Sequence, residues 1–295
     1  MNKPGLSIVI PTYNEKDNIS KILEKLKKSL KGITYEIIFV DDNSPDGTSF
    51  EIKNFIKNSS KIQLIHRLGR RGLSGAIIEG IFAARSELVA VMDCDLQHDE
   101  TKLRDMLDLF SKDASLDIVI GSRFTADGEI SSNAFSKMRK LGSKVTTFLI
   151  KKLLRIKSTD PLSGFFMVKK ESFLKKSDKL QTQGFKVLAD FLATSGTSIE
   201  IKEVGYSFKN RVAGESKMSF LTALELIGLV LSQILKGRVS IRFILFCMVG
   251  LSGIFVQLLI TGLAMLLINQ FPTSQTLGIV AAMTSNYFLN NVTTF

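Results

Sequence analysis

The chain of 295 residues has no tryptophan, two cysteines and two histidines. Cys94 lies in a predicted site and Cys247 in a long apolar run, so no disulfide is expected. His66 and His98 do not form a metal-binding cluster, and we expect His98 to support a neighbouring group or to lie at the surface. The G-x-G-x-x-G fingerprint and the P-loop pattern are also absent, which argues against two common classes of phosphate-binding fold.

Charged side chains are absent from residues 243–295. The run FILFCMVGLSGIFVQLLITGLAMLLI is long enough to cross a bilayer core of about 30 Å, and QTLGIVAAMTSNYFL is a weaker second candidate. We therefore predict a two-helix transmembrane segment over 241–295, with spans at about 243–268 and 275–291. A buried hairpin of a soluble protein is the alternative.

The cations next to this segment predict its orientation. Lys236, Arg238 and Arg242 precede the first span, and no basic residue follows it. The positive-inside rule then keeps residues 1–242 in the cytoplasm. Residues 6–11 are too short for a signal peptide. The sequence predicts a multi-pass protein of the inner (cytoplasmic) membrane with its globular part in the cytoplasm.

Positive charge is concentrated in one block. Residues 131–242 carry 21 basic and 8 acidic side chains, whereas residues 1–130 carry 18 and 20. Within the block, KMRKLGSKVTTFLIKKLLRIK (137–157) and the stretch 218–240 mix cations with apolar residues, as interfacial helices on anionic membrane lipids do. A solvated basic face is the alternative. Nucleic acid is not expected as a partner, because a membrane segment has no role there.

Short apolar runs alternate with helical patterns over the first 125 residues, which predicts an α/β fold: a mostly parallel sheet with helices on both faces. The expected strands lie in the stretches LSIVIPTYN, YEIIFVDDNSPDGT, IQLIH, LVAVMDCD and LDIVIGSRF, the first two of which end in polar or turn residues. The expected helices cover residues 18–31, 48–58, 73–86 and 99–112.

Several of these strands end in polar residues. Open α/β sheets bind ligands beyond the carboxyl ends of their strands. Four strand ends should therefore converge in one crevice, those that carry Tyr13-Asn14-Glu15, Asp41-Asp42, Asp93 with Asp95, and Arg123.

The fourth strand ends in two aspartates. Strand alternation would place the carboxylates of Asp93 and Asp95 on the same side, where a divalent cation would relieve their repulsion. Gln97 follows in the same alternation and could add a carbonyl oxygen. A solvated strand end is the alternative explanation for the D-x-D pattern taken alone.

The ordered motifs IVIPTYNE, VDDNSPDGT, MDCDLQH, GSRF, DPLSGFFMVKK and RVAGESKMS resemble family-2 glycosyltransferases of the GT-A (Rossmann-like) fold. Within that family they are similar to polyprenyl-phosphate transferases of the dolichol-phosphate mannose synthase type. The resemblance covers about residues 5–220, and the tail resembles the first half of a GtrA-like membrane domain. It implies a GT-A domain at 1–217, an interfacial helix at 218–240 and a membrane segment at 241–295.

The resemblance also implies residue roles. Donor binding would fall to Pro11, Tyr13, Glu15, Val40, Asp42, Asp93 and Gln97. The ligands of Mg²⁺ or Mn²⁺ would be Asp93, Asp95 and Gln97. The acceptor phosphate would bind Arg123, Arg139, Arg211, Ser216 and Lys217. Catalysis would depend most on Asp95, Arg123 and Arg211. The chain departs from the family pattern at Cys94 and Asp99, neither of which replaces a ligand.

The implied activity is a metal-dependent, inverting transfer of a sugar onto a polyprenyl or dolichyl phosphate at the cytoplasmic membrane face. Mannose from GDP-mannose is the first choice of donor, and UDP-glucose or a UDP-N-acetylhexosamine is the alternative. A non-catalytic membrane scaffold with the same fold is a third reading. Processive polysaccharide synthases share the fold but carry a Q-x-x-R-W motif, which a chain without tryptophan cannot contain.

Overall fold

The computed structural model describes residues 3–69, 72–125, 129–130, 156–180, 187–209, 239 and 241–293. The chain divides into two compact units, Met1–Lys217 and Met218–Phe295. The predicted interfacial segments lie almost wholly outside the described residues.

The first unit is built on a seven-stranded sheet of order β3-β2-β1-β4-β7-β5-β8. Strands β1 to β4 run parallel to one another, β5 and β8 form a second parallel pair, and β7 joins the two groups in antiparallel orientation. This arrangement confirms the predicted mostly parallel sheet. The strands are β1 Leu6–Thr12, β2 Tyr35–Asp41, β3 Ile62–His66, β4 Leu88–Val91, β5 Ile118–Ser122, β7 Phe166–Lys169 and β8 Ile201–Gly205. A separate pair is formed by β6 Glu129–Ile130 and β9 Ser207–Phe208.

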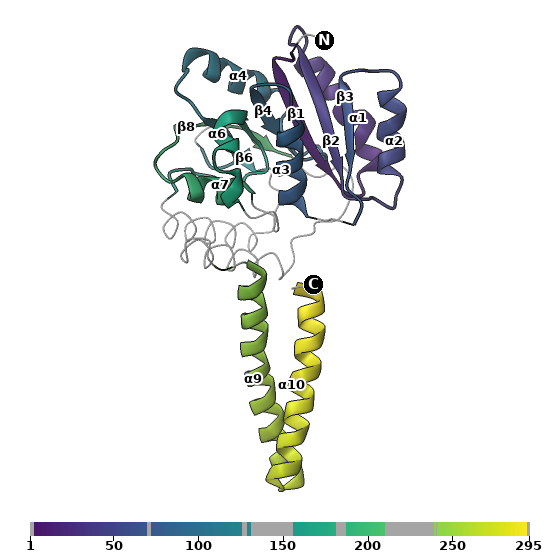
Figure 1. Ribbon diagram of the computed structural model, residues 1–295, viewed down its shortest axis with the longest axis vertical. Coiled ribbons are helices and arrows are strands. Elements are labelled where there is room, and N and C mark those ends of the chain that lie inside the picture. The colour runs from purple at the N-terminus through teal and green to yellow at the C-terminus, as the bar shows by residue number, and fades with distance from the viewer. Residues whose placement is uncertain are drawn as a thin grey trace. The chain divides into compact units, whose positions relative to one another are not determined.

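Helices cover both faces of the sheet, as Figure 1 shows. On one face, apolar residues of α1, α2 and α4 join those of β1 and β2 in a single core. On the other face, α3 packs against β1 and β2 and contacts α6 and α7. The helices are α1 Lys16–Ser29, α2 Thr48–Ile56, α3 Leu73–Ala83, α4 Lys102–Lys112, α6 Lys170–Leu174 and α7 Val187–Ser195, with a 3₁₀ turn at Ser177–Lys179.

The core follows from residue spacing. In α1, the fully buried residues Ile19, Ile22 and Leu26 recur at helical spacing and face the sheet. In α3, Gly80 lies so close to the sheet that a Cβ there would fall 2.3 Å from a methyl group of Val9. These contacts hold the strand ends, and therefore the candidate site, in fixed positions.

Strand β4 is shorter than predicted, because it ends at Val91 rather than at Asp95. Its partner β7 begins at Phe166, which pairs with Val91, so the antiparallel ladder stops there. The aspartates therefore lie in a turn, where Leu96 adopts a φ of 63°. Strand alternation was the wrong reason for placing their carboxylates together.

The second unit contains two long helices, α9 Ile241–Ile268 and α10 Phe271–Thr293. Among the described residues, one segment is long and apolar enough to cross a membrane, namely Phe243–Ile268. The second predicted span lies in α10, which is long enough to cross a membrane but less apolar than Phe243–Ile268. The helices pack closely where Gly253 meets Asn286 and where Gly278 meets Thr261.

Candidate active site

The loops after β1 and β2 are joined by hydrogen bonds at the carboxyl end of the sheet. The backbone N–H of Asn14 donates to Ser44 Oγ at 3.0 Å, and the N–H of Glu15 donates to Thr48 Oγ1 at 3.0 Å. Asn14 has a φ of 58°, in the left-handed region that asparagine tolerates better than most residues. The predicted donor residues Tyr13 and Glu15 therefore lie in a loop of defined conformation.

Asp42 at the end of β2 is tied to the loop between β3 and α3. Its carboxylate accepts a hydrogen bond from Arg67 Nη1 and a second, of 2.7 Å, from the backbone N–H of Gly72. Arg67 also donates to Glu79 at 3.2 Å. This network ties Arg67 and Gly72 to the end of β2, and we call these two residues and Asp42 the wall beside β2.

Two predicted donor residues are buried in the sheet. Pro11 and Val40 pair with each other across β1 and β2, and neither side chain is exposed at the strand ends. They can meet a donor only through the main chain or by shaping the residues around them.

The charges of three predicted carboxylates act on the buried side chain of Cys94. Burial raises the pKa of the Cys94 thiol well above its usual value, and the negative charges of Glu15, Asp95 and Asp93 raise it further. The thiol therefore stays protonated and is unsuited to bind a metal. Asp95 is 4% exposed and accepts a hydrogen bond of 3.1 Å from the backbone N–H of Gln97. The Asp93 side chain is 36% exposed.

The chemistry of this cluster suits a hard divalent cation. Asp93, Asp95 and the amide of Gln97 offer only oxygen atoms, which Mg²⁺ and Mn²⁺ prefer. Among the residues that the structure describes, no group of three or more His, Cys, Asp or Glu side chains forms a ready metal cage. A cation held here would need oxygens from Gln97 and from a bound phosphate to complete its coordination.

Arg123 at the end of β5 is paired with Asp160. Its Nε and Nη2 donate to the two carboxylate oxygens of Asp160 at 2.7 and 2.8 Å, and Asp160 is fully buried. Burial alone would lower the pKa of the Arg123 guanidinium, but the hydrogen bonds to Asp160 outweigh this effect and raise the pKa above its usual value. The guanidinium also lies over the ring of Phe208, 5.4 Å from its centroid.

The residues that support these groups could be predicted only in part from the sequence. Asp160 belongs to the quoted motif DPLSGFFMVKK, which could have indicated its importance but not its partner. His98 was expected to play a supporting or surface role. It is buried, with Nε2 3.1 Å from Asp93 Oδ2 and Nδ1 2.9 Å from Tyr206 Oη. Asp99 accepts hydrogen bonds from the backbone and hydroxyl of Thr101, just before α4.

Four predicted acceptor residues, Arg139, Arg211, Ser216 and Lys217, lie outside the described residues. Of the predicted acceptor set, the structure therefore places only Arg123.

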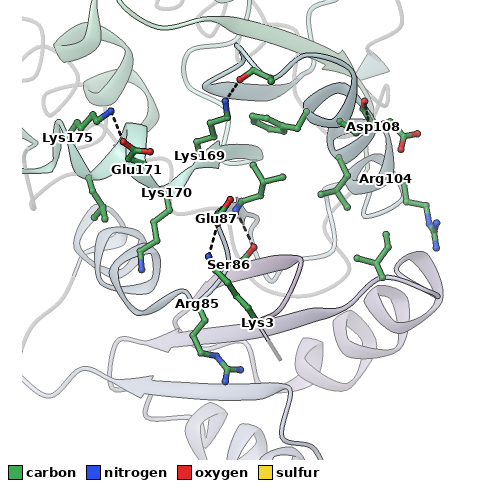
Figure 2. Close-up of a pocket in the computed structure, with 17 residues that line it drawn as sticks. Lys3, Arg85, Ser86, Glu87, Arg104, Asp108, Lys169, Lys170, Glu171 and Lys175 are labelled. Carbon is green, nitrogen blue, oxygen red and sulfur yellow. Dashed lines mark hydrogen bonds and ion pairs between the residues drawn. The ribbon is translucent and has the colours of Figure 1, made fainter. Parts of the chain in front are cut away.

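A cavity of about 1440 Å³ lies at the opposite end of the sheet. Figure 2 shows Lys3, Arg85, Glu87, Lys169 and Lys170 around it. None of the predicted site residues lines this cavity. Its cations are engaged locally: Lys170 Nζ, for example, donates to the carbonyls of Phe82 and Ala84 at the end of α3.

Comparison with known proteins identifies the family. Residues 7–175 match the model of glycosyl transferase family 2. The chain belongs to glycosyl transferase family 2. This family-2 chain is 34% identical to a dolichol-phosphate mannosyltransferase of Pyrococcus furiosus over 98% of its own length and 81% of that protein. Enzymes of the same name from Mycosarcoma maydis and Saccharomyces cerevisiae are 31% and 30% identical, over 73% and 72% of this chain and 74% and 80% of theirs. The predicted resemblance to family-2 glycosyltransferases of the dolichol-phosphate mannose synthase type is confirmed.

Solved structures confirm the GT-A type of fold. The glucosyl-3-phosphoglycerate synthase of Mycobacterium tuberculosis, in complex with Mn²⁺, UDP-glucose and phosphoglyceric acid, matches with a TM-score of 0.61. The match covers 78% of this chain and 79% of that one at 16% identity. The same enzyme in complex with Mg²⁺ and UDP matches with a TM-score of 0.60, also at 16% identity and over 78% and 79% of the two chains.

Proposed function

We propose that this family-2 glycosyltransferase moves mannose from GDP-mannose onto a polyprenyl or dolichyl phosphate at the cytoplasmic face of a membrane. The observation that carries the proposal is the similarity to a dolichol-phosphate mannosyltransferase over nearly the whole chain, apolar C-terminal part included. The charges of Glu15, Asp95 and Asp93 support it, because all three act on the buried Cys94, and a bound cation would offset negative charge in this region.

The donor would lie across the ends of β1, β2 and β4. The loop at Tyr13 and Glu15 and the wall that contains Asp42 would hold the nucleoside, and Asp93, Asp95 and Gln97 would bind Mg²⁺ or Mn²⁺. When bound, the cation would offset the negative charge that develops on the leaving diphosphate. Positioning by this loop and wall, together with electrostatic stabilisation, would provide most of the rate acceleration.

The acceptor phosphate would approach Arg123, whose guanidinium is already oriented by Asp160. Arg139, Arg211, Ser216 and Lys217 would complete the phosphate site. A phosphate monoester is an anionic nucleophile at neutral pH, so one phosphate oxygen can attack the anomeric carbon directly as the bond to the nucleoside diphosphate breaks. A single displacement of this kind inverts the anomeric configuration.

The membrane location follows from the acceptor. An isoprenoid phosphate stays in the bilayer, so the enzyme must work at its surface. Helix α9 contains a segment apolar and long enough to anchor the chain, and the basic residues of 131–217 would bind anionic headgroups, each contributing about 1 kcal/mol near the surface. By the positive-inside rule, the globular unit would face the cytoplasm.

Transfer assays with labelled donors test the proposal. The full chain, in vesicles containing a polyprenyl phosphate, should form lipid-linked sugar from GDP-mannose and lose this activity with chelator. Product from UDP-glucose or a UDP-N-acetylhexosamine instead would reassign the donor. Release of no nucleoside diphosphate from any donor would favour the scaffold. Turnover undiminished by chelator would remove the cation from the mechanism.

A further inference from the structure

His98 connects the predicted metal site to the segment Tyr206–Lys209, which we call the support segment. The imidazole is 2% exposed, and its two nitrogens meet Asp93 Oδ2 and Tyr206 Oη. Because a carboxylate can only accept a hydrogen bond, Nε2 carries the hydrogen and donates to Asp93. In the neutral ring, Nδ1 then accepts from the Tyr206 hydroxyl. Both nitrogens of the ring are thus used in one orientation.

Aromatic packing holds the same ring in place. The centroid of the imidazole lies 5.3 Å from that of Phe165, with the planes inclined by 27°, and 5.8 Å from that of Phe208. Phe165 follows Gly164, where a Cβ would fall 2.8 Å from Asp93 Oδ2. His98 and the Gly164 backbone therefore both lie against this oxygen, and together they restrict how the carboxylate can rotate.

The support segment also holds Gln97. The backbone N–H of Lys209 donates to the Gln97 carbonyl at 3.0 Å, and Gln97 Nε2 donates to the Lys209 carbonyl at 2.9 Å. This pairing leaves the side-chain oxygen Oε1 as the atom of Gln97 suited to a cation. Two of the three predicted ligands are thus oriented by one short segment, directly for Gln97 and through His98 for Asp93.

We propose that His98, backed by Tyr206, is a positioning residue that holds the Asp93 carboxylate in the orientation that binds the divalent cation with the donor diphosphate. The inference rests on the proposed function, since it assigns His98 to the same site. Hydrogen-bond partners that orient a ligand typically contribute about 10- to 100-fold to metal affinity. A purely structural His98 would stabilise the aromatic cluster and leave metal affinity unchanged.

The test is a titration of Mn²⁺ into the detergent-solubilised full chain in the presence of GDP, with free Mn²⁺ measured by electron paramagnetic resonance. His98→Phe keeps an aromatic ring and removes both hydrogen bonds, so it should raise the Kd for Mn²⁺ by about 10- to 100-fold. Tyr206→Phe removes a single hydroxyl and should raise the Kd by a smaller factor. The double variant should bind Mn²⁺ no more weakly than His98→Phe alone, because Tyr206 acts through His98.

A matched control comes from another aromatic pair. Phe173 is fully buried and stacks on Phe191 at 5.2 Å, away from the carboxylates. Phe173→Leu should lower the Tm and leave the Kd for Mn²⁺ unchanged. If His98→Phe does not fold, the Kd of Tyr206→Phe for Mn²⁺ tests the inference, since this variant keeps the ring that packs in the aromatic cluster.

Two results would overturn the inference in distinguishable ways. Normal Mn²⁺ binding by the parent and by every variant, with only the Tm lowered as in Phe173→Leu, would make His98 structural and leave the proposed function intact. Failure of the parent itself to bind Mn²⁺ with GDP would remove the metal site from the proposed function, and His98 would lose its role with it.

Discussion

Charged side chains are arranged differently at the two ends of the seven-stranded sheet. At the amino end, around the large cavity, cations are satisfied one by one: Lys3 pairs with Glu87 at 2.8 Å and Lys169 Nζ donates to a main-chain carbonyl at 2.5 Å. At the carboxyl end, the negative charges of Glu15, Asp95 and Asp93 all act on the buried Cys94, and the cation Arg123 is paired with Asp160.

This difference separates a large cavity from a reactive site. A charge that is neutralised by a near neighbour stabilises the fold and interacts only weakly with a ligand. Like charges that are grouped raise the free energy of the empty protein, and a cation that enters recovers this energy. The active site is therefore expected at the carboxyl end of the sheet, although the cavity lies at the amino end.

The largest expected effect on transfer comes from removing one of the predicted metal ligands. Asp95→Asn removes one charge without changing the shape of the side chain, so transfer from GDP-mannose should fall by ~100-fold or more in kcat/KM, which is about 2.7 kcal/mol in the barrier. Glu87→Gln removes a charge of the amino end and serves as the control. It should leave kcat/KM unchanged, and equal losses in both variants would contradict the distinction between the two ends.

The second prediction concerns stability at the carboxyl end. Asp160→Asn leaves the Arg123 guanidinium buried with a weaker partner, so the free energy of unfolding should fall by ~3 kcal/mol in urea denaturation of the solubilised protein. Replacing both residues, Arg123→Met with Asp160→Leu, should recover much of this stability without recovering transfer. Asp160→Asn with unchanged stability would show that the pair is not buried in solution.

The smallest expected effect lies at the amino end and depends on pH. A hydrogen bond from Lys202 is the main reason why the pKa of Asp113 falls from 3.8 to about 2. A lowered folded pKa adds stability above the unfolded value, and this contribution is lost as pH falls through the folded value of about 2. Lys202→Met should therefore have a slightly lower Tm than the parent at neutral pH, and the difference should shrink as pH falls toward 2. A difference in Tm that grows as the pH falls would contradict the assignment of the lowered Asp113 pKa to Lys202.

Much of the fold could be predicted from local pattern. The five expected strands are present as β1 to β5, because each is a run of apolar residues bounded by turn residues. The antiparallel strand β7 was not predicted. Its four residues follow the turn at Gly164, and its direction depends on pairing with β4 and β5 rather than on its own composition.

The candidate site was predictable in part. The carboxyl-end rule for α/β sheets places Glu15, Asp93 and Asp95 at the same edge of the sheet without knowledge of side-chain positions. The partners that orient them come from distant parts of the chain: Asp160 holds Arg123, and Tyr206 reaches Asp93 through His98. Such pairings depend on tertiary packing, and they cannot be predicted from the spacing of residues in the sequence.

The position of β7 has a consequence for biosynthesis. This strand follows β5 in sequence but lies between β4 and β5 in the sheet. On the ribosome, β3, β2, β1 and β4 can assemble first, whereas β5 has no edge to join until Lys169 has left the exit tunnel. The support segment then emerges after β8 and completes the surroundings of Asp93. The surroundings of Asp93 would thus be completed late, at about the time when the apolar helix α9 is synthesised.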